Sequence, residues 1–392
     1  MKVAIIGAGV GGLTAAVALA RKGIEVEIYE QASALGPVGA SLQLGPNALR
    51  LMAELELLEP LRTVGMVPDA VEFVRWEDGS LLLHTDLGSA MEDHFGAPQL
   101  DLFRPDLHRI LLERCPPGAV HLGARVQRVE QSDSGVVLTL ADGTRAAADL
   151  AVAADGIRST IRKQLLGADH PEFAGTVVYR GLAERAAVVE HHPRTVDMYW
   201  IGPERHGVCY WISSGRLLAV NCSVRDAEFS KESWTLEASV SEVLRDFEGW
   251  DDGLLARIRG CRWVLRGAVF VRRPIDQWSY GLVTLLGDAA HAMAPFQAQG
   301  AAQAVEDAFV LGECLGSERD DPLAALARYE QLRTARAEEL QASSSGAADA
   351  FYLPDGEQQQ ARDEGYSTLL ERLPWGPRQP IWEHDVREAL AG

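Results

Sequence analysis

The sequence predicts an α/β protein that combines a Rossmann-type dinucleotide-binding domain with a β-meander, an antiparallel-sheet domain and a C-terminal helix. Three observations support this fold class. The chain opens as strand, glycine-rich turn, helix and strand. Its middle consists of short aromatic and β-branched runs separated by turn residues, which is typical of an antiparallel sheet. Its last third returns to a short apolar strand followed by Ala-rich helical sequence.

The opening segment is interpreted as one βαβ unit. Strands are expected at residues 2–6 and 25–29, with a helix at 13–22 between them and the glycines of 7–12 at the turn. A signal peptide is the alternative interpretation, because residues 3–20 are almost entirely apolar or small. The glycines would weaken a membrane-inserting helix, and the segment continues without a break into the second strand. We therefore assign it to the fold.

The next elements alternate between two sheets. A hairpin is expected at 71–76 and 81–85, because the Asp-Gly dipeptide between these runs suits a tight turn. Four strand-like runs between residues 120 and 154 predict a β-meander that returns to a buried strand. The runs between residues 176 and 224 predict the antiparallel sheet.

The last part of the chain predicts a buried strand at 282–286, a helix from 300 to about 315, and a helix at 322–341 that precedes an irregular tail. The nucleotide-binding domain is thus expected to be assembled from separated segments, with a second domain inserted between them. The expected boundaries are 1–70, 98–175 and 270–392 for the first domain, and 71–97 and 176–269 for the second.

The charge of the chain restricts its partners. Asp and Glu number 56 against 37 Lys and Arg, which gives a formal net charge of −19. Such a protein repels phosphate backbones and anionic lipid headgroups, so we expect neither a nucleic acid nor a membrane partner. A small anionic substrate would need locally placed Arg or dipolar donors. A monomer and a homodimer both remain open.

The cysteines predict a cytoplasmic protein with reduced thiols. They are odd in number, widely spaced and lack a Cys-x-x-Cys pair: Cys115, Cys209, Cys222, Cys261 and Cys314. This spacing argues against a disulfide reductase and against a structural zinc site, so no metal ligands are expected.

The glycine turn carries the first chemical signal. Gly7, Gly9 and Gly12 fit G-x-G-x-x-G, in which the first turns the chain, the second admits a pyrophosphate and the third allows close helix packing. Glu30 ends the second strand, where its carboxylate can accept hydrogen bonds from ribose hydroxyls. These residues predict dinucleotide binding, and taken by themselves they fit FAD and NAD equally.

Two later motifs favour FAD over NAD. Residues 154–159 with Arg162, and residues 287–291 with Pro295 and Gly300, resemble the Asp-Gly segment and the second FAD motif of the class A flavoprotein hydroxylases, the para-hydroxybenzoate hydroxylase superfamily. The resemblance spans most of the chain and implies an FAD-binding domain joined to a substrate-binding domain. Asp155 could alternatively cap the following helix.

The resemblance also implies which residues contact FAD. In relatives the Asp of the second motif holds a ribityl hydroxyl, and the helix that starts near Gly300 points its positive end at the flavin pyrimidine edge. Relatives often carry glycine where Ala298 stands, and His291 is expected to pack or hydrogen bond. The implied FAD contacts are Gly7, Gly9, Gly12, Glu30, Arg104, Val126, Asp155, Gly156, Asp288, Pro295, Gly300, Ala301 and Ala302.

Residues 39–47 and 103–107 narrow the resemblance to salicylate, 3-hydroxybenzoate and 6-hydroxynicotinate hydroxylases. The hydroxynicotinate type is expected to carry a His base where Gln43 stands, and Gln cannot take a proton, which argues against that exact substrate. Cys209 and Tyr210 alternate across a strand, so at most one of them points inward. The candidate substrate contacts are Gln43, Cys209, Tyr210 and Phe296.

These motifs predict an FAD-dependent monooxygenase. In the family, NADH or NADPH reduces FAD, O2 adds at flavin C4a, and the hydroperoxide transfers one oxygen atom to a small hydroxylated aromatic or N-heteroaromatic ring, while the protein positions and shields the reactants. Two alternatives remain open at this point. One is an epoxidase or reductase on the same scaffold, and the other is a non-catalytic FAD-binding sensor.

Overall fold

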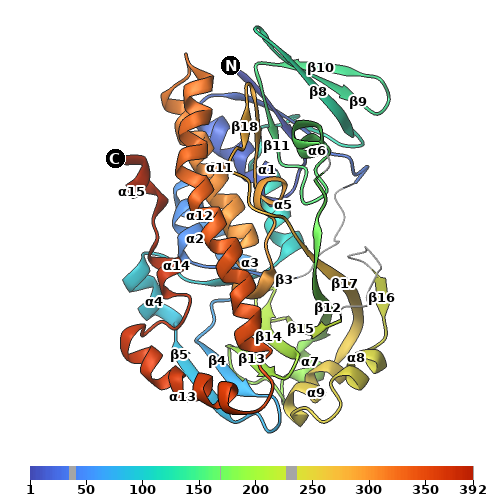
Figure 1. Ribbon diagram of the computed structural model, residues 1–392, viewed down its shortest axis with the longest axis vertical. Coiled ribbons are helices and arrows are strands. Elements are labelled where there is room, and N and C mark those ends of the chain that lie inside the picture. The colour runs from blue at the N-terminus through green and yellow to red at the C-terminus, as the bar shows by residue number, and fades with distance from the viewer. Residues whose placement is uncertain (35–40, 168, 227–235, 392) are drawn as a thin grey trace.

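The computed structural model describes residues 1–34, 41–167, 169–226 and 236–391 (Figure 1). The molecule is elongated, with a parallel sheet and the meander at one end and a large sheet at the other, as Figure 1 shows. The long helix α12, Pro322–Phe351, runs beside both regions. Among the described residues, no helix is long and apolar enough to cross a membrane.

The first sheet has six strands in the order β18-β19-β11-β1-β2-β7. Strands β19, β11, β1, β2 and β7 pair in parallel, which is the predicted Rossmann arrangement, and α1 (Val10–Arg21) connects β1 to β2. The strands are β1 Lys2–Ile6, β2 Glu25–Tyr29, β7 Val120–His121, β11 Leu150–Ala153, β18 Ser279–Tyr280 and β19 Val283–Leu285.

The predicted meander follows β7 as a three-stranded antiparallel sheet, and its turns lie at the predicted Ser-Gly and Asp-Gly sites. It comprises β8 Val126–Ser132, β9 Gly135–Leu140 and β10 Arg145–Ala148. The chain then returns to the parallel sheet through β11 and continues into α6, Thr160–Leu166.

The second large sheet has eight strands in the order β16-β17-β12-β15-β14-β13-β4-β5. It is antiparallel except for the pair β4 and β13, so the predicted hairpin forms one edge of the predicted sheet. The strands are β4 Ala70–Arg75, β5 Leu81–Asp86, β12 Glu172–Glu184, β13 Val196–Gly202, β14 Arg205–Ile212, β15 Leu217–Arg225, β16 Leu236–Ala238 and β17 Cys261–Val271.

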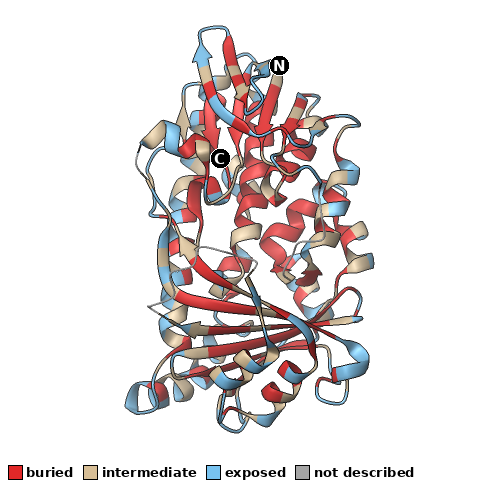
Figure 2. Ribbon diagram, turned by 90° about the vertical axis from the view of Figure 1, so that its right-hand side faces the viewer, coloured by how far each residue is buried: buried red, intermediate tan, exposed pale blue. Residues whose placement is uncertain are grey.

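The two faces of this sheet pack against different parts of the chain, and its strands are largely buried (Figure 2). Side chains on the outer face join a core with three short helices, α7 Arg185–Val188, α8 Val240–Asp246 and α9 Asp252–Arg259. Side chains on the inner face pack with Phe296 and with the C-terminal elements α13 Glu357–Arg372 and α14 Gln379–Glu383. The inner face is therefore the one turned towards the nucleotide-binding region.

Short helices and a two-stranded sheet lie between these regions. Strands β3 (Ser41–Leu44) and β6 (Leu100–Phe103) pair in antiparallel fashion, opposite β13 and β14. The remaining helices are α2 Pro46–Glu54, α3 Leu58–Val64, α4 Gly88–Phe95, α5 Arg104–Arg114, α10 Asp288–His291, α11 Gly300–Ser317 and α15 Val386–Ala391, with a 3₁₀ turn at Pro295–Gln297.

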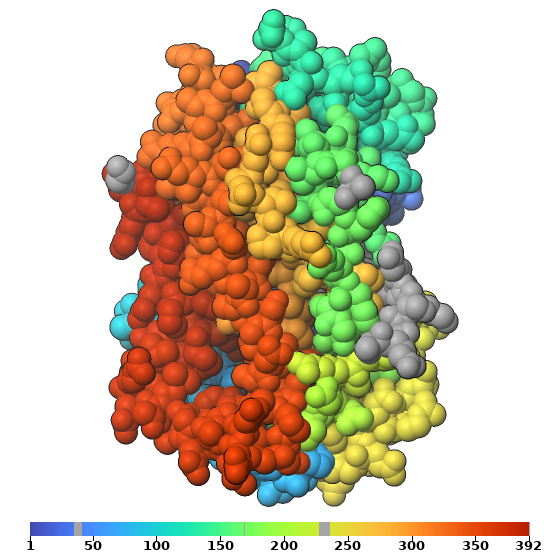
Figure 3. All heavy atoms as spheres, in the orientation of Figure 1, coloured from blue at the N-terminus to red at the C-terminus, as the bar shows by residue number. Residues whose placement is uncertain are grey.

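The expectation of an irregular tail after residue 341 is wrong. Helix α12 continues to Phe351, and three more helices follow it. Helix α13 is polar over most of its length and buries Tyr366, which joins the inner-face core. The C-terminal elements were expected in the first domain, but they pack against the second sheet, and Figure 3 shows the red C-terminal segment over that end of the molecule. The division into two domains stays a proposal.

Candidate active site

The glycine turn after β1 leaves room for a ligand at one position and none at its neighbours. A Cβ on Gly12 would lie 2.0 Å from the Gly7 oxygen, and one on Gly7 would lie 2.4 Å from the Ala154 oxygen. A Cβ on Gly9 would meet no described atom within 4 Å. Gly9 precedes α1 without a side-chain cap, so the first N–H groups of this helix can bind phosphate oxygens.

Glu30 lies directly behind this turn. Its carboxylate accepts hydrogen bonds from the backbone N–H groups of Ala8 and Ala32, each at 2.8 Å. Both oxygens keep further acceptor capacity for ribose hydroxyls. The segment that leads to Val126 runs beside Glu30, because the Ala124 N–H donates to the Glu30 carbonyl at 2.8 Å. The glycine turn is also held by His108, whose Nε2 lies 2.6 Å from the Ala8 oxygen, a contact that no motif indicated.

Asp155 has the role that the alternative interpretation proposed, because it binds the N-terminal N–H groups of α6, whose N-cap residue is Ser159. Its Oδ2 accepts hydrogen bonds from the N–H groups of Thr160 (2.8 Å) and Ile161 (3.3 Å). Its Oδ1 is buried and has no hydrogen-bond partner among the described residues, and burial raises the pKa of this carboxyl. Gly156 adopts φ +77°, with no described atom within 4 Å of a Cβ. A ligand donor could satisfy the buried oxygen here.

The second motif meets the first one. A Cβ on Gly11 would lie 2.6 Å from Leu286 Cδ2, so β19, α1 and α11 converge. Asp288 is exposed although Ala289 and Ala290 are buried, and its Oδ1 lies 3.9 Å from the Cβ position of Gly300. No side chain of the described residues caps α11, which leaves the N–H groups of Gly300, Ala301 and Ala302 for a ligand. Pro295 is exposed at the start of the 3₁₀ turn.

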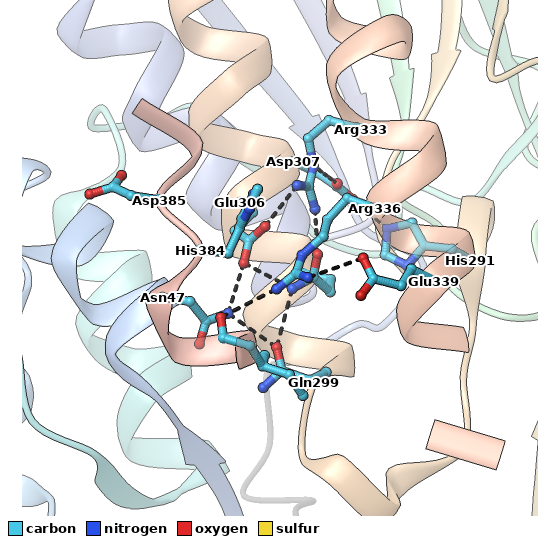
Figure 4. Close-up of polar contacts among 12 residues, drawn as sticks. Asn47, His291, Gln299, Glu306, Asp307, Arg333, Arg336, Glu339, His384 and Asp385 are labelled. Carbon is cyan, nitrogen blue, oxygen red and sulfur yellow. Dashed lines mark hydrogen bonds and ion pairs between the residues drawn. The ribbon is translucent and has the colours of Figure 1, made fainter. Parts of the chain in front are cut away.

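A buried polar network joins the 287–291 motif to α11 and α12 (Figure 4). Asp307 Oδ2 accepts from the Gly287 N–H at 3.0 Å and lies 2.6 Å from His291 Nε2. Arg333 of α12 donates to Asp307 (2.8 Å), Glu306 (2.7 Å) and Gln303 (2.6 Å). His291 thus has the hydrogen-bonding role that was expected. The network links the flavin-motif turn to α11 and α12.

The residue where relatives often carry glycine adopts a glycine-like conformation. Ala298 has φ +55° and ψ +34°, which is the left-handed region. This conformation costs an alanine about 1–2 kcal/mol. The turn between Phe296 and α11 therefore keeps the shape that glycine would give it.

The inner sheet face carries a polar group opposite β3. The Tyr210 hydroxyl donates to Ser41 Oγ at 2.7 Å, and Asn221 Nδ2 donates to the same oxygen at 3.2 Å. Arg180 is the cross-strand neighbour of Asn221, and burial lowers its pKa to about 10, with a further contribution from the Arg104 guanidinium. Arg180 thus places a positive charge near Tyr210, and Arg104 lies near Arg180, in a protein of negative net charge.

Of the other candidate substrate contacts, Cys209 lies on the outer face of the large sheet, whereas Phe296 packs against its inner face. Cys209 is fully buried on the outer face with Trp200 and Leu254, so we do not propose it as a substrate contact. Phe296 packs on the inner face against His206, with ring centroids 5.5 Å apart. Residues 39 and 40 of the predicted 39–47 segment lie outside the described residues.

Gln43 is committed to other protein groups. Its Nε2 donates to Asp101 Oδ1 (3.1 Å) and Asp197 Oδ2 (2.6 Å), and its Oε1 accepts from Tyr199 (2.8 Å) and Arg378 (3.3 Å). Two donors and two acceptor sites exhaust the capacity of an amide, so Gln43 has little left for a substrate. Sequence reasoning missed these partners, because they come from three distant segments without a shared motif.

These positions together fit FAD. Uncapped helix N-termini, open backbone space at Gly9 and Gly156, and a buried Asp155 oxygen without a partner among the described residues are what a pyrophosphate and a polyol require. The fold and this site thus define a dinucleotide-binding flavoprotein.

Comparison with known proteins assigns the family. Residues 1–344 match the FAD binding domain model, so the chain belongs to this family. It is 40% identical to the 3-amino-4-hydroxybenzoate 2-monooxygenase PtmB3 of Streptomyces platensis over 95% of this chain and 93% of the relative. It is 33% identical to the 6-hydroxynicotinate 3-monooxygenase of Bordetella bronchiseptica, over 87% and 89%. A solved salicylate hydroxylase substrate complex has a TM-score of 0.84 at 28% identity, covering 99% and 96%.

The predicted class is therefore confirmed. The chain is an FAD-dependent monooxygenase of the aromatic hydroxylase type, for which NAD(P)H and O2 are the typical co-substrates.

Proposed function

We propose that this enzyme hydroxylates a small phenolic ring that carries a carboxylate, of the amino-hydroxybenzoate type. The observation behind the proposal is the Arg180 guanidinium on the inner sheet face, beside Tyr210 and near Arg104. Because the net charge of −19 repels anions, a local cation at low dielectric is what an anionic substrate needs. The identity to PtmB3, a monooxygenase of 3-amino-4-hydroxybenzoate, points in the same direction.

The roles of the side chains follow from this arrangement. Arg180 would bind the carboxylate, the Tyr210 hydroxyl held by Ser41 would orient the ring, and Phe296 would cover the ring from the flavin side. Gly7, Gly9, Gly12, Glu30, Arg104, Val126, Asp155 and Gly156 from the first part, and Asp288, Pro295, Gly300, Ala301 and Ala302 from the second, would hold the FAD. When bound and reduced, FAD supplies the activated oxygen.

A matched pair of substrates tests the carboxylate. 3-Amino-4-hydroxybenzoate and 2-aminophenol differ only in that group. NAD(P)H oxidation and product mass are measured for both, with wild type and with Arg180→Gln. We expect coupled addition of one oxygen to the acid, a KM roughly 10- to 100-fold higher for the acid in the variant, and little change for the phenol, because a hydrogen bond to a charged group contributes about 1.5–3 kcal/mol.

Either of two results would contradict the proposal. Equal kcat/KM for the acid and the phenol would show that the carboxylate does not contribute to substrate recognition. An FAD-loaded protein that oxidises NAD(P)H with neither compound, nor with a wider panel of hydroxybenzoates and hydroxypyridines, would reject the substrate class.

A further inference from the structure

Two buried carboxyl groups face each other between the two-stranded sheet and the large sheet. Asp101 of β6 and Asp197 of β13 are each 1% exposed. Both accept hydrogen bonds from the same two amide nitrogens, Gln43 Nε2 (3.1 and 2.6 Å) and Gln99 Nε2 (3.2 and 2.8 Å). Carboxyl oxygens that share two donors in this way must lie close together.

The charges around this pair do not balance if both groups are ionised. In the part of the chain that the structure describes, the titratable or charged groups that face it are Tyr199, Tyr210 and Arg378. Arg378 donates to the Tyr199 hydroxyl (2.8 Å) and to Gln43 Oε1 (3.3 Å), both of which are neutral acceptors. Two carboxylates against one guanidinium would leave a net negative charge in the interior, which is costly.

We propose that Asp101 and Asp197 hold one proton between them at neutral pH and form, with Arg378, an electrically neutral unit that positions the substrate-binding strand β3. The proton resides on Asp101, and Asp197 carries the charge that compensates Arg378. Burial and the neighbouring Asp197 raise the pKa of Asp101 well above its usual range, and burial raises the pKa of Asp197 to about 6.

The pair reaches the site through Gln43. The four hydrogen bonds of this amide fix β3, and the same strand carries Ser41, which accepts from Tyr210. Asp101, Asp197 and Arg378 are thus positioning residues for Tyr210, and this part of the inference rests on the proposed function.

The proton itself is tested without substrate. Infrared spectra are recorded for the FAD-loaded wild type and for Asp101→Asn, so that flavin bands cancel in the difference. We expect the carbonyl band of one protonated carboxylic acid in the wild type at pH 7.5, shifted by ¹³C-aspartate labelling and missing from Asp101→Asn. A wild type without this band, or a band that persists in Asp101→Asn, would overturn the proposal.

Two isosteric variants test the positioning role. Asn resembles a protonated Asp, so Asp101→Asn should keep the wild-type thermal midpoint, whereas the double variant Asp101→Asn, Asp197→Asn removes both carboxyl groups, leaves Arg378 uncompensated and should lower the midpoint. At pH 7.5 we expect kcat/KM to fall about tenfold in the double variant, one hydrogen bond's contribution, and by less in Asp101→Asn, whose amide oxygen can still accept from Gln43 and Gln99.

The pH dependence of kcat/KM distinguishes positioning through the charged pair from a purely structural role, because a purely structural role would leave this dependence unchanged. Protonation of Asp197 near pH 6 should give kcat/KM an acid limb in wild type and Asp101→Asn, and none in the double variant, which has no carboxyl group at this place. Equal losses in both variants would overturn the inference. If no substrate is turned over, the infrared and thermal results still decide on the proton, and only the proposed function fails.

Discussion

Removal of the Arg333 guanidinium is expected to destabilise this protein more than the loss of any exposed ion pair. The side chain is fully buried and contacts Asp307, Glu306 and Gln303 through three separate nitrogens, at 2.6–2.8 Å. In Arg333→Ala, the carboxylates of Glu306 and Asp307, 1% and 0% exposed, lose their buried cation. Breaking a buried pair in this way costs about 3–5 kcal/mol, against a total stability of about 5–15 kcal/mol for an ordinary domain.

The assay is urea unfolding followed by tryptophan fluorescence, together with FAD content after purification. Because Asp307 also accepts from the Gly287 N–H, FAD content should fall with stability. Arg328→Ala is the matched control on the same helix. Arg328 is 41% exposed, lies 3.7 Å from Glu318 and donates to the Leu390 carbonyl at 2.8 Å, so its loss should cost about 1–2 kcal/mol, less than that of Arg333.

Two outcomes decide the matter. If Arg333→Ala and Arg328→Ala unfold at the same urea concentration, the reasoning about buried charge is refuted. If the reasoning holds, the triple variant Arg333→Met, Glu306→Gln and Asp307→Asn should recover part of the loss, because replacing a whole buried ionic cluster by neutral groups is often close to neutral.

Three further predictions concern the turns and the buried histidine. Gly9→Ala should fold with an unchanged apoprotein midpoint but lose FAD, whereas Gly12→Ala should fail to fold or be strongly destabilised, because its Cβ would lie 2.0 Å from the Gly7 oxygen; thermal scans and FAD absorbance distinguish the two. Ala298→Gly should raise stability by up to about 1 kcal/mol, since relief of about 1–2 kcal/mol of backbone strain exceeds the entropy cost of glycine, and an unchanged or lower urea midpoint would contradict this. Burial lowers the pKa of His206 to about 3, so the unfolded chain binds a proton near pH 6.5 that the folded chain refuses, and stability should fall as pH drops from about 6.5 towards 3. This pH dependence should weaken in His206→Phe, and an identical pH profile of the urea midpoint would speak against it.

The sequence predicted the fold well where local signals and tertiary roles agree. The opening βαβ unit is such a case, because its glycines, apolar periodicity and terminal acid all belong to contiguous residues. Helix α13 was missed for the opposite reason. It is polar on most of its surface, and it exists because Tyr366 and a few neighbours pack on the large sheet, where the Tyr366 ring contacts Phe73 of β4, 293 residues earlier in the chain.

In the candidate site, too, the sequence could not predict contacts between distant segments. Alternation along β14 predicted that Cys209 and Tyr210 point to opposite faces, but only the packing of α8 and α9 decides which face is the outer one. Gln43 was singled out as a candidate substrate contact by its place in a motif, whereas its hydrogen bonds go to other protein groups. Its partners Asp197 and Arg378 could not be predicted, since contacts between distant segments leave no pattern in a single sequence.

The strand order of the parallel sheet has a consequence for biosynthesis. Strand β1 is complete after six residues, but β19, which completes the flavin site with α11, begins at Val283, 277 residues after Ile6. At about 5–20 residues per second, a ribosome needs roughly 15–55 s to cover this distance. During that time the nascent chain carries a cofactor motif that lacks its other half. FAD can therefore act on folding only near the end of translation, as a ligand that captures the finished domain.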